Sequence, residues 1–323
     1  MFKKAALKVS AAVLSLFAFT SCSNDLIDDN GKINVVCTVF PCYDWAREIV
    51  GSSENVYITY LLDDGSDLHS FQPTAADMIR ISECDVFVYI GGESDRWVDK
   101  ALENAVNKDM KVVRLMDSLA ESLEVGEHNH AEHEGEEHDH SHEEAAFDEH
   151  IWLSLNNAQV CVTDIAAVLS AVDSENVQTY SDRANAYNTE LQLLDRNLHM
   201  LFDENPQTMI FGDQFPFVYF TSDYGIEHFA AFSGCSADTE ASFKTITELA
   251  EKVDELNVQT VFTIENSNCN IAEAIISNTA DKSQEIAVLD SIQSVNKEQI
   301  DNGYTYKSAM ESNYKILKEV YSS

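Results

Sequence analysis

Short apolar runs alternate with amphipathic stretches along most of this chain. In the first half, the apolar runs have the length of buried strands and most amphipathic stretches have helical spacing. Strands that alternate with helices predict a mostly parallel sheet with helices on both faces. The predicted elements of this half are strands at residues 33–40, 56–62, 85–90 and 112–115, with helices near 43–50, after a break at Pro41, and 73–83.

The same alternation returns in the last third of the chain. It predicts a second lobe, so that the fold class is α/β with two lobes, each a mostly parallel sheet flanked by helices. The predicted elements of this lobe are strands at residues 209–211, 229–232, 260–264 and 286–289, with helices at 242–257, 271–280 and 306–321.

A long helix at residues 174–204 is predicted to join the two lobes. Its apolar residues recur three and four positions apart, which places them on one helix face. At 1.5 Å per residue, about 30 residues reach ~45 Å, enough to cross a small domain. We therefore expect a first lobe at residues 33–157, a linking helical segment at 158–204 and a second lobe at 205–323. The apolar face comprises Val177, Tyr180, Ala184, Tyr187, Leu191, Leu194, Leu198 and Leu201.

Residues 1–21 have the layout of a secretory signal peptide. Three lysines precede a short apolar run that is closed by small residues, and the run is too short to span a bilayer. Residues 19–22 (FTSC) resemble a bacterial lipobox, which would leave Cys22 as the lipidated first residue of the mature chain. We expect export and anchoring to the cell envelope through Cys22 and a tether at 22–32. The alternative is a cleaved secreted protein in which Cys22 is incidental.

The chain is strongly acidic, with 20 Lys and Arg against 56 Asp and Glu and a formal charge of −36. This balance argues against nucleic-acid binding, because phosphate neutralisation requires clustered cations. It favours attraction of cations instead. Export permits disulfides, but the six cysteines after Cys22 allow 15 pairings, and the sequence does not choose among them. We expect most of them to be buried as small hydrophobic residues.

Residues 124–149 change abruptly to histidine and acid. Too little apolar surface is present for this stretch to order itself, so we expect a mobile loop. Neutral imidazole is the commonest transition-metal ligand in proteins, and repeated His-x-His spacings suit weak, exchanging zinc contacts. A solvated charge run is the alternative. The predicted auxiliary metal ligands are His128, His130, His133, His138, His140 and His142.

Four further positions have side chains suited to a metal. His69 lies in a loop after a strand, and His150 ends the histidine-rich loop. Asp213 and Glu265 follow buried strands of the second lobe, at the sheet edge where ligands of α/β proteins bind. Taken singly, each has an ordinary explanation as a surface imidazole, a helix cap or a turn residue.

Hydrolase and nucleotide-binding motifs such as His-Glu-x-x-His, Gly-x-Ser-x-Gly and the P-loop are missing from the sequence.

Several motifs together resemble one known family, the ZnuA-like zinc/manganese solute-binding proteins of bacterial ABC importers. The resemblance covers nearly the whole mature chain, and it implies two α/β lobes joined by a rigid linking helix, with the metal in the cleft between them. The motifs are VFP at 39–41 with YDW at 43–45, DLHSFQP at 67–73, DVFVY at 85–89, HIWLS at 150–154, DYG at 223–225 and GYTY at 303–306.

The resemblance also implies a ligand set. His69 and His150 match the two histidines of the first lobe, and Glu265 matches the acidic position of the second. The second lobe usually supplies a further histidine, where this chain has Asp213 followed by Gln214. Of the two we choose Asp213, because a carboxylate binds Zn²⁺ whereas a neutral amide is a poor ligand for it.

Two carboxylates make this a harder ligand set than three histidines would, and harder oxygen ligands suit Mn²⁺. Zn²⁺ also accepts mixed sites, and the histidine-rich insert resembles those of zinc importers, so we expect Zn²⁺ over Mn²⁺. The expected function is an extracytoplasmic, monomeric receptor that passes Zn²⁺ to an ABC permease and its ATPase. The alternatives are a Mn²⁺ receptor of the same fold, a metalloenzyme with these ligands, and a surface scavenger or adhesin without a transporter.

Overall fold

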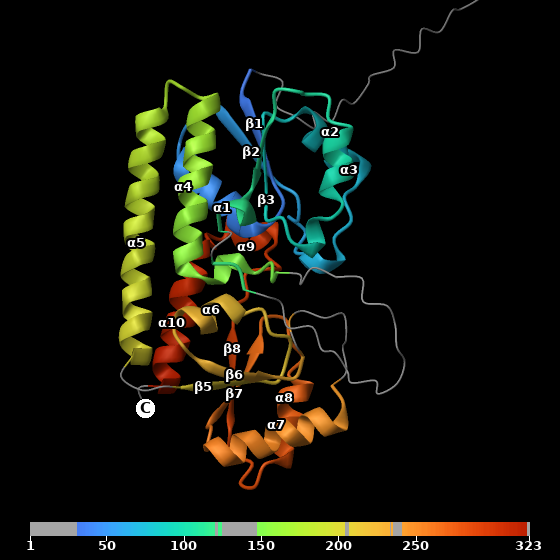
Figure 1. Cartoon of the computed structure of the whole chain (residues 1–323), viewed down its shortest axis with the longest axis vertical. Helices are drawn as coiled ribbons and strands as arrows, with labels where there is room; N and C mark the ends of the chain where they lie inside the picture. The colour runs from blue at the N-terminus through green and yellow to red at the C-terminus, as the bar shows by residue number, and fades with distance from the viewer. Residues whose placement is uncertain are drawn as a thin grey trace, which may run out of the picture.

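The computed structural model describes residues 31–119, 122–124, 147–203, 207–232, 234 and 241–321. The predicted signal peptide, Cys22 and the six loop histidines lie outside the described residues, and their roles stay predictions. The described chain folds into two parallel four-stranded sheets flanked by helices, which confirms the predicted fold class (Figure 1).

The sheet of the first lobe has the strand order β2-β1-β3-β4, with all pairs parallel. Figure 1 shows α2 and α3 on one side of this sheet and α1 and α4 on the other. The elements are β1 Ile33–Cys37, α1 Phe40–Val50, β2 Val56–Tyr60, α2 Ala75–Glu83, β3 Val86–Tyr89, α3 Val98–Glu103 and β4 Lys111–Arg114, with the short 3₁₀ helices η1 Leu68–Ser70, η2 Glu93–Asp95, η3 Leu115–Leu119 and η4 Ile151–Leu153.

The sheet of the second lobe has the equivalent order β6-β5-β7-β8, again parallel throughout. In both sheets the first strand of the lobe lies inside the sheet. The second strand pairs with one of its edges and the third strand with the other, so the direction of winding reverses at the first strand. Ligands of such sheets bind at the carboxyl ends of the strands near this reversal. The elements are β5 Thr208–Phe211, α6 Val218–Asp223, β6 Glu227–Ala230, α7 Phe243–Leu256, β7 Thr260–Ile264, α8 Asn270–Asn278, β8 Glu285–Leu289, α9 Lys297–Asp301 and α10 Tyr306–Tyr321.

Two long helices, α4 (Leu155–Val172) and α5 (Val177–Asp203), pack along one side of the molecule (Figure 1). The 27 residues of α5 reach about 40 Å, and the helix extends from beside α1 in the first lobe to α10 in the second. Its predicted apolar face is buried at Tyr180, Leu191 and Leu198, while Val177 at its first residue is exposed. Among the helices of the described residues, α4 alone is long and apolar enough to cross a membrane, and it packs against α1 and α5 in the core.

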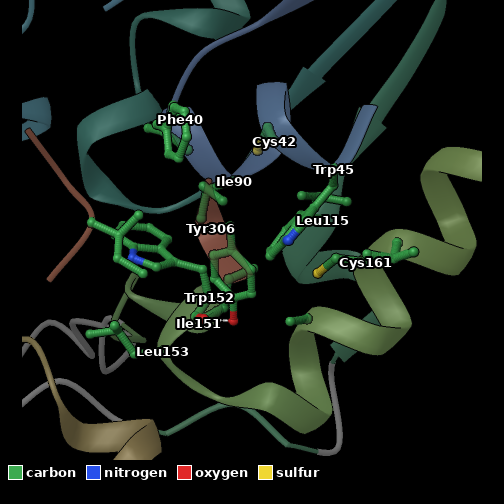
Figure 2. Packing of buried hydrophobic residues seen from close by; sticks show 14 of the residues in the cluster. Phe40, Cys42, Trp45, Ile90, Leu115, Ile151, Trp152, Leu153, Cys161 and Tyr306 are labelled. Carbon is green, nitrogen blue, oxygen red and sulfur yellow. Dashed lines mark hydrogen bonds between the residues drawn. The ribbon is translucent and has the colours of Figure 1, made fainter. Parts of the chain in front are cut away.

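One continuous hydrophobic cluster runs through both lobes. Figure 2 shows its centre, where Trp45 of α1, Trp152 of η4 and Tyr306 of α10 come together, although they lie far apart in the sequence. A second, smaller cluster lies in the second lobe between its sheet and the helices α7 and α8. Cys37, Cys42, Cys84 and Cys161 are buried free thiols, as expected for most of the cysteines.

Some boundaries differ from those predicted. The first helix begins at Phe40 rather than near Tyr43, and Pro41 lies in its first turn, where a missing N–H leaves no hydrogen bond unmade. The short helices α3, α6 and α9 were not predicted, because six residues or fewer give too little periodicity to recognise.

Candidate metal centre

His69 lies in η1, beyond the carboxyl end of β2. The Asp67 carboxylate accepts a hydrogen bond from the backbone N–H of His69 (2.8 Å) and so caps this short helix. The imidazole itself has other partners: its Nδ1 lies 2.9 Å from Oε1 of Glu149 and 3.1 Å from Oγ of Ser94. Asp67 lies only two positions before His69, but its carboxylate is engaged by the backbone N–H, and Glu149 is the carboxylate that faces Nδ1 of the ring.

Glu149 directly precedes His150 in the sequence, and its buried side chain faces the ring of His69. Ser94 donates to both of its oxygens, from the backbone N–H (3.0 Å) and from Oγ (2.6 Å). Gly92 permits this approach, since a Cβ there would come within 2.3 Å of Cβ of Glu149. Burial raises the pKa of Glu149, but the hydrogen bonds from His69 and Ser94 and the charge of His150 outweigh it, so the pKa lies below its ordinary value. The carboxylate is therefore ionised at neutral pH.

His150 precedes η4, and its side chain is only 2% exposed. Its Nδ1 lies 2.9 Å from Oδ1 of Asp148, which also accepts from the backbone N–H of His150 (2.8 Å). Asp148 is held in turn by Tyr219 of α6, whose hydroxyl donates to the Asp148 carbonyl (2.7 Å).

The two imidazoles lie next to each other, with ring centroids 5.3 Å apart. In each ring a carboxylate faces Nδ1, which favours a proton on that nitrogen and leaves the lone pair on Nε2. A carboxylate behind each imidazole is the usual arrangement around histidine ligands of metals, because it orients the ring and raises its basicity. The pair His69 and His150 is thus suited to bind a metal through Nε2.

Asp213 follows β5 directly after Gly212. Its Oδ1 accepts from the backbone N–H of Gln214 (2.9 Å), and its Oδ2 lies 3.4 Å from the backbone nitrogen of Ile264. Gly212 is required here, since a Cβ would come within 2.5 Å of Cα of Ala272 in α8. Asp213 and Gln214 both face the cavity described below.

Glu265 follows β7, the strand next to β5. Ser291 donates to both of its oxygens, from the backbone N–H to Oε2 (2.7 Å) and from Oγ to Oε1 (2.6 Å). Burial and the neighbouring charge of Asp290 raise the pKa of Glu265, and the Ser291 hydrogen bonds act against that rise. A bound cation would favour the ionised form further.

A cavity of about 580 Å³ separates the lobes at this point, with Asp64 and Asp67 on one wall and Asp213, Gln214 and Glu265 on the other. The lobes touch at its rim, where the backbone N–H of Lys297 donates to the carbonyl of Asp63 (2.8 Å). Among the described residues that line it, neither histidine of the predicted ligand set is found.

The structure therefore brings the four predicted ligands together as two pairs. His69 and His150 are in ring contact, and Asp213 and Glu265 share the cavity. Within the described ranges, no three His, Cys, Asp or Glu side chains lie close enough together to hold a metal ion. The set of four stays a prediction.

Sequence reasoning missed the residues that orient the ligands, namely Ser94, Glu149 and Ser291. Asp148 and Glu149 stand directly before His150 in the sequence, and this acidic pair was the available signal. Serines give no such signal, because their contacts with Glu149 and Glu265 join segments 55 and 26 residues apart.

Comparisons with known proteins agree with this architecture. The chain is 31% identical over 314 residues to the zinc-binding lipoprotein AdcA of Streptococcus pneumoniae, covering 97% of this chain and 60% of that protein. It is 29% identical over 325 residues to the high-affinity zinc uptake system protein ZnuA of Bacillus subtilis, covering 99% and 98% of the two chains. The crystal structure of the Zn(II)-bound ZnuA-like domain of S. pneumoniae AdcA superposes with a TM-score of 0.70 at 26% identity, over 91% of this chain and all of that one.

The chain spans about 60% of the length of the AdcA relative, so it corresponds to one part of that protein. The profile of the family described as "Zinc-uptake complex component A periplasmic" matches residues 35–320, which include both lobes and all four predicted ligands. With this match over nearly the whole described structure, the chain belongs to the ZnuA family.

Proposed function

We propose that this protein is an extracytoplasmic receptor that captures Zn²⁺ between its two lobes and delivers it to an ABC permease and its ATPase. The observation that carries the proposal is the pair of adjacent imidazoles, each with a carboxylate at Nδ1, beside an acidic cavity lined by both lobes. The relatives named as zinc-binding and zinc-uptake proteins support the same cargo.

In this proposal the ligands are His69 and His150, through Nε2, together with Asp213 and Glu265. The ion would join the two pairs, because Zn²⁺ binds both imidazole nitrogen and carboxylate oxygen. Four protein ligands leave no open position on Zn²⁺, whereas a catalytic zinc keeps one for water or substrate. We therefore propose a transport role rather than hydrolysis.

Mn²⁺ is the second candidate cargo, and the two carboxylates are the observation that favours it. Against it, imidazole is the better ligand for Zn²⁺, and Zn²⁺ exceeds Mn²⁺ in affinity for most mixed sites. Lipidation at Cys22, the tether at 22–32, the lobe boundaries at 157 and 205 and a monomeric state complete the proposal.

The deciding experiment is a competition titration of the mature chain against a chromophoric chelator, with Zn²⁺ and Mn²⁺ in separate series. We expect one tight Zn²⁺ site and Mn²⁺ binding at least tenfold weaker. Elemental analysis of protein purified from its native host should find zinc. Tighter binding of Mn²⁺, with manganese in the native protein, would show that the cargo is Mn²⁺. Failure to bind either ion tightly would refute the proposed receptor function.

A further inference from the structure

Ser291 is the residue that orients Glu265. It lies just beyond β8, is fully buried, and donates to the two carboxylate oxygens from two different groups, its backbone N–H (2.7 Å) and its Oγ (2.6 Å). A carboxylate bound at both oxygens cannot rotate freely. The position of Ser291 therefore determines where the Glu265 carboxylate points.

Ser291 is itself tied to the first lobe by Trp152. The indole Nε1–H of Trp152 donates to the Ser291 carbonyl (2.8 Å), although the two residues are 139 positions apart. Trp152 follows His150 by two residues, and its ring meets the imidazole edge to face, with centroids 5.2 Å apart. One side chain therefore contacts the histidine of one lobe and the residue that orients the carboxylate of the other. We call this connection the Trp152–Ser291 bridge.

The first-lobe end of the bridge is anchored in the core. The Tyr306 hydroxyl donates to the Trp152 carbonyl (2.6 Å), and the Tyr306 backbone N–H donates to Asp44 of α1 (2.7 Å). Trp152, Tyr306 and Asp44 are all fully buried, and Figure 2 shows Trp152 and Tyr306 among the packed aromatic and aliphatic side chains. Movement of Trp152 would disturb this packing, so the bridge is rigid.

The second-lobe end carries backbone strain. Ile292, next to Ser291, has a φ of +62°, a region that a β-branched residue rarely adopts. Its backbone N–H donates to Oδ1 of Asp290 (2.8 Å), and its side chain is fully buried, which keeps it in this conformation. Strain of this kind is concentrated at functional sites, where the surrounding structure maintains it.

We propose that Trp152 and Ser291 are positioning residues for the metal: the bridge sets the distance and angle between the His150 imidazole and the Glu265 carboxylate. This inference rests on the proposed function, since it needs both residues to bind the ion. Groups that orient metal ligands typically contribute 10- to 100-fold to affinity. The bridge connects two ligands in different lobes, so it acts on the geometry of the whole site and not on one ligand alone.

The test compares variants of the full mature chain by Zn²⁺ competition titration and by the visible spectrum of bound Co²⁺, which reports ligand geometry. Ser291→Ala removes the 2.6 Å bond and Trp152→Phe removes the Nε1–H donor; each should weaken Zn²⁺ binding at least tenfold and alter the Co²⁺ spectrum. Ser291→Thr keeps a hydroxyl, so its Zn²⁺ affinity should be closer to that of the unmodified protein than to that of Ser291→Ala.

The matched control is Ser154→Ala. Ser154 is also buried, and its Oγ donates to Oδ2 of Asp223 at the same distance of 2.6 Å, but this pair lies outside the predicted ligand set. The control should lose stability as Ser291→Ala does and bind Zn²⁺ normally. Equal loss of affinity in both variants would show that affinity follows stability, and would overturn the inference.

Two further outcomes separate this inference from the proposed function. If the unmodified chain fails to bind Zn²⁺ tightly, the receptor itself is refuted. If it binds tightly but Ser291→Ala and Trp152→Phe bind as well as it does, only the bridge is refuted. Glu265→Gln belongs in the same series, because unchanged affinity there would leave the bridge with no ligand to position.

Discussion

Three of the four predicted ligands of this protein have a neighbour that determines their orientation. Glu149 and Asp148 face Nδ1 of the two histidines, and Ser291 donates to both oxygens of Glu265. Such contacts restrict each side chain to few conformations before an ion binds. The entropy cost of binding is therefore smaller, which raises affinity. At the residue scale, the site is already ordered in two separate halves.

Replacing either histidine should abolish tight binding. In His69→Ala and His150→Ala we expect Zn²⁺ affinity to fall at least 100-fold, about 2.7 kcal/mol, because each change removes a metal bond. Competition titration measures the loss. His199→Ala is the matched control, since that imidazole lies on α5 beside Asp195 and is 40% exposed. Affinity that survives the change at either 69 or 150 would remove that residue from the site.

The choice between Asp213 and Gln214 can be made with two substitutions. Asp213→Asn keeps the size of the side chain and an oxygen that can accept from the Gln214 N–H but removes its charge, so Zn²⁺ affinity should fall by tenfold or more. Gln214→Ala should change affinity less than twofold. The same titration decides, and the reverse result would make Gln214 the ligand.

The histidines could be selected as candidate ligands from sequence because they lie in local motifs, residues 67–73 and 150–154. The groups that orient them could not. Glu149 reaches His69 across 80 positions of sequence, and the pairing exists only because the chain returns from the histidine-rich loop beside η2. Contacts of this kind follow from the tertiary fold and leave no periodic signal.

At the scale of elements, the two lobes are joined by a helix terminus as well as by helix packing. The first residue of α10, Tyr306, donates its backbone N–H to Asp44 of α1, and Asp44 also pairs with Arg47 one turn further along α1. The carboxylate thus occupies the N-terminus of α10, where a negative charge is favourable. Its complete burial has the opposite effect and raises its pKa to about 6, despite Arg47 and Tyr306.

This raised pKa should make stability depend on pH. The folded-state pKa lies above the unfolded value near 3.9, so the folded protein binds the proton more tightly. The contribution of Asp44 is then fully present below about pH 4 and is lost as the pH rises through about 6, by up to roughly 3 kcal/mol. Urea unfolding between pH 4 and 7 measures the slope. Asp44→Asn should flatten it, and an unchanged slope in that variant would refute the role of Asp44.

The long elements were predictable because periodicity accumulates over many residues, as in α5, or because a buried run is bounded by polar turns, as in β7. The order of strands in each sheet was not predictable from the same pattern. That order depends on how the strands and the helices α1, α4 and α7 pack together in three dimensions. The pattern of apolar residues within each strand would be the same for any order.

At the scale of the whole molecule, charge and loop composition act on the approach of the ion. The formal charge of −36 raises the local concentration of cations and should speed capture at low ionic strength. Six of the ten histidines belong to the predicted auxiliary loop. The four predicted ligands of the tight site lie outside this loop, so tight binding and weak collection of metal should be separable.

Deleting residues 125–146 tests this separation. We expect one tight Zn²⁺ site to remain with an affinity within twofold of the full chain, while the total number of bound ions falls, as measured by equilibrium dialysis. A chain with the six loop histidines changed to Asn keeps the acids and serves as the control for charge. Loss of the tight site on deletion would instead place that site in the loop.

The continuous hydrophobic cluster has a consequence for how this molecule comes apart. Because one cluster extends from β1 to α10, neither lobe can melt without exposing part of the other, and calorimetry should record a single cooperative transition. The described residues of the smaller cluster beneath α7 and α8 all belong to the second lobe, so these helices can open without disturbing the first lobe. They should therefore exchange their amide hydrogens earliest among the buried elements. Native-state hydrogen exchange would then rank the outer layer of the second lobe as the least protected, with Glu265 just beyond β7, a strand that contributes to both clusters.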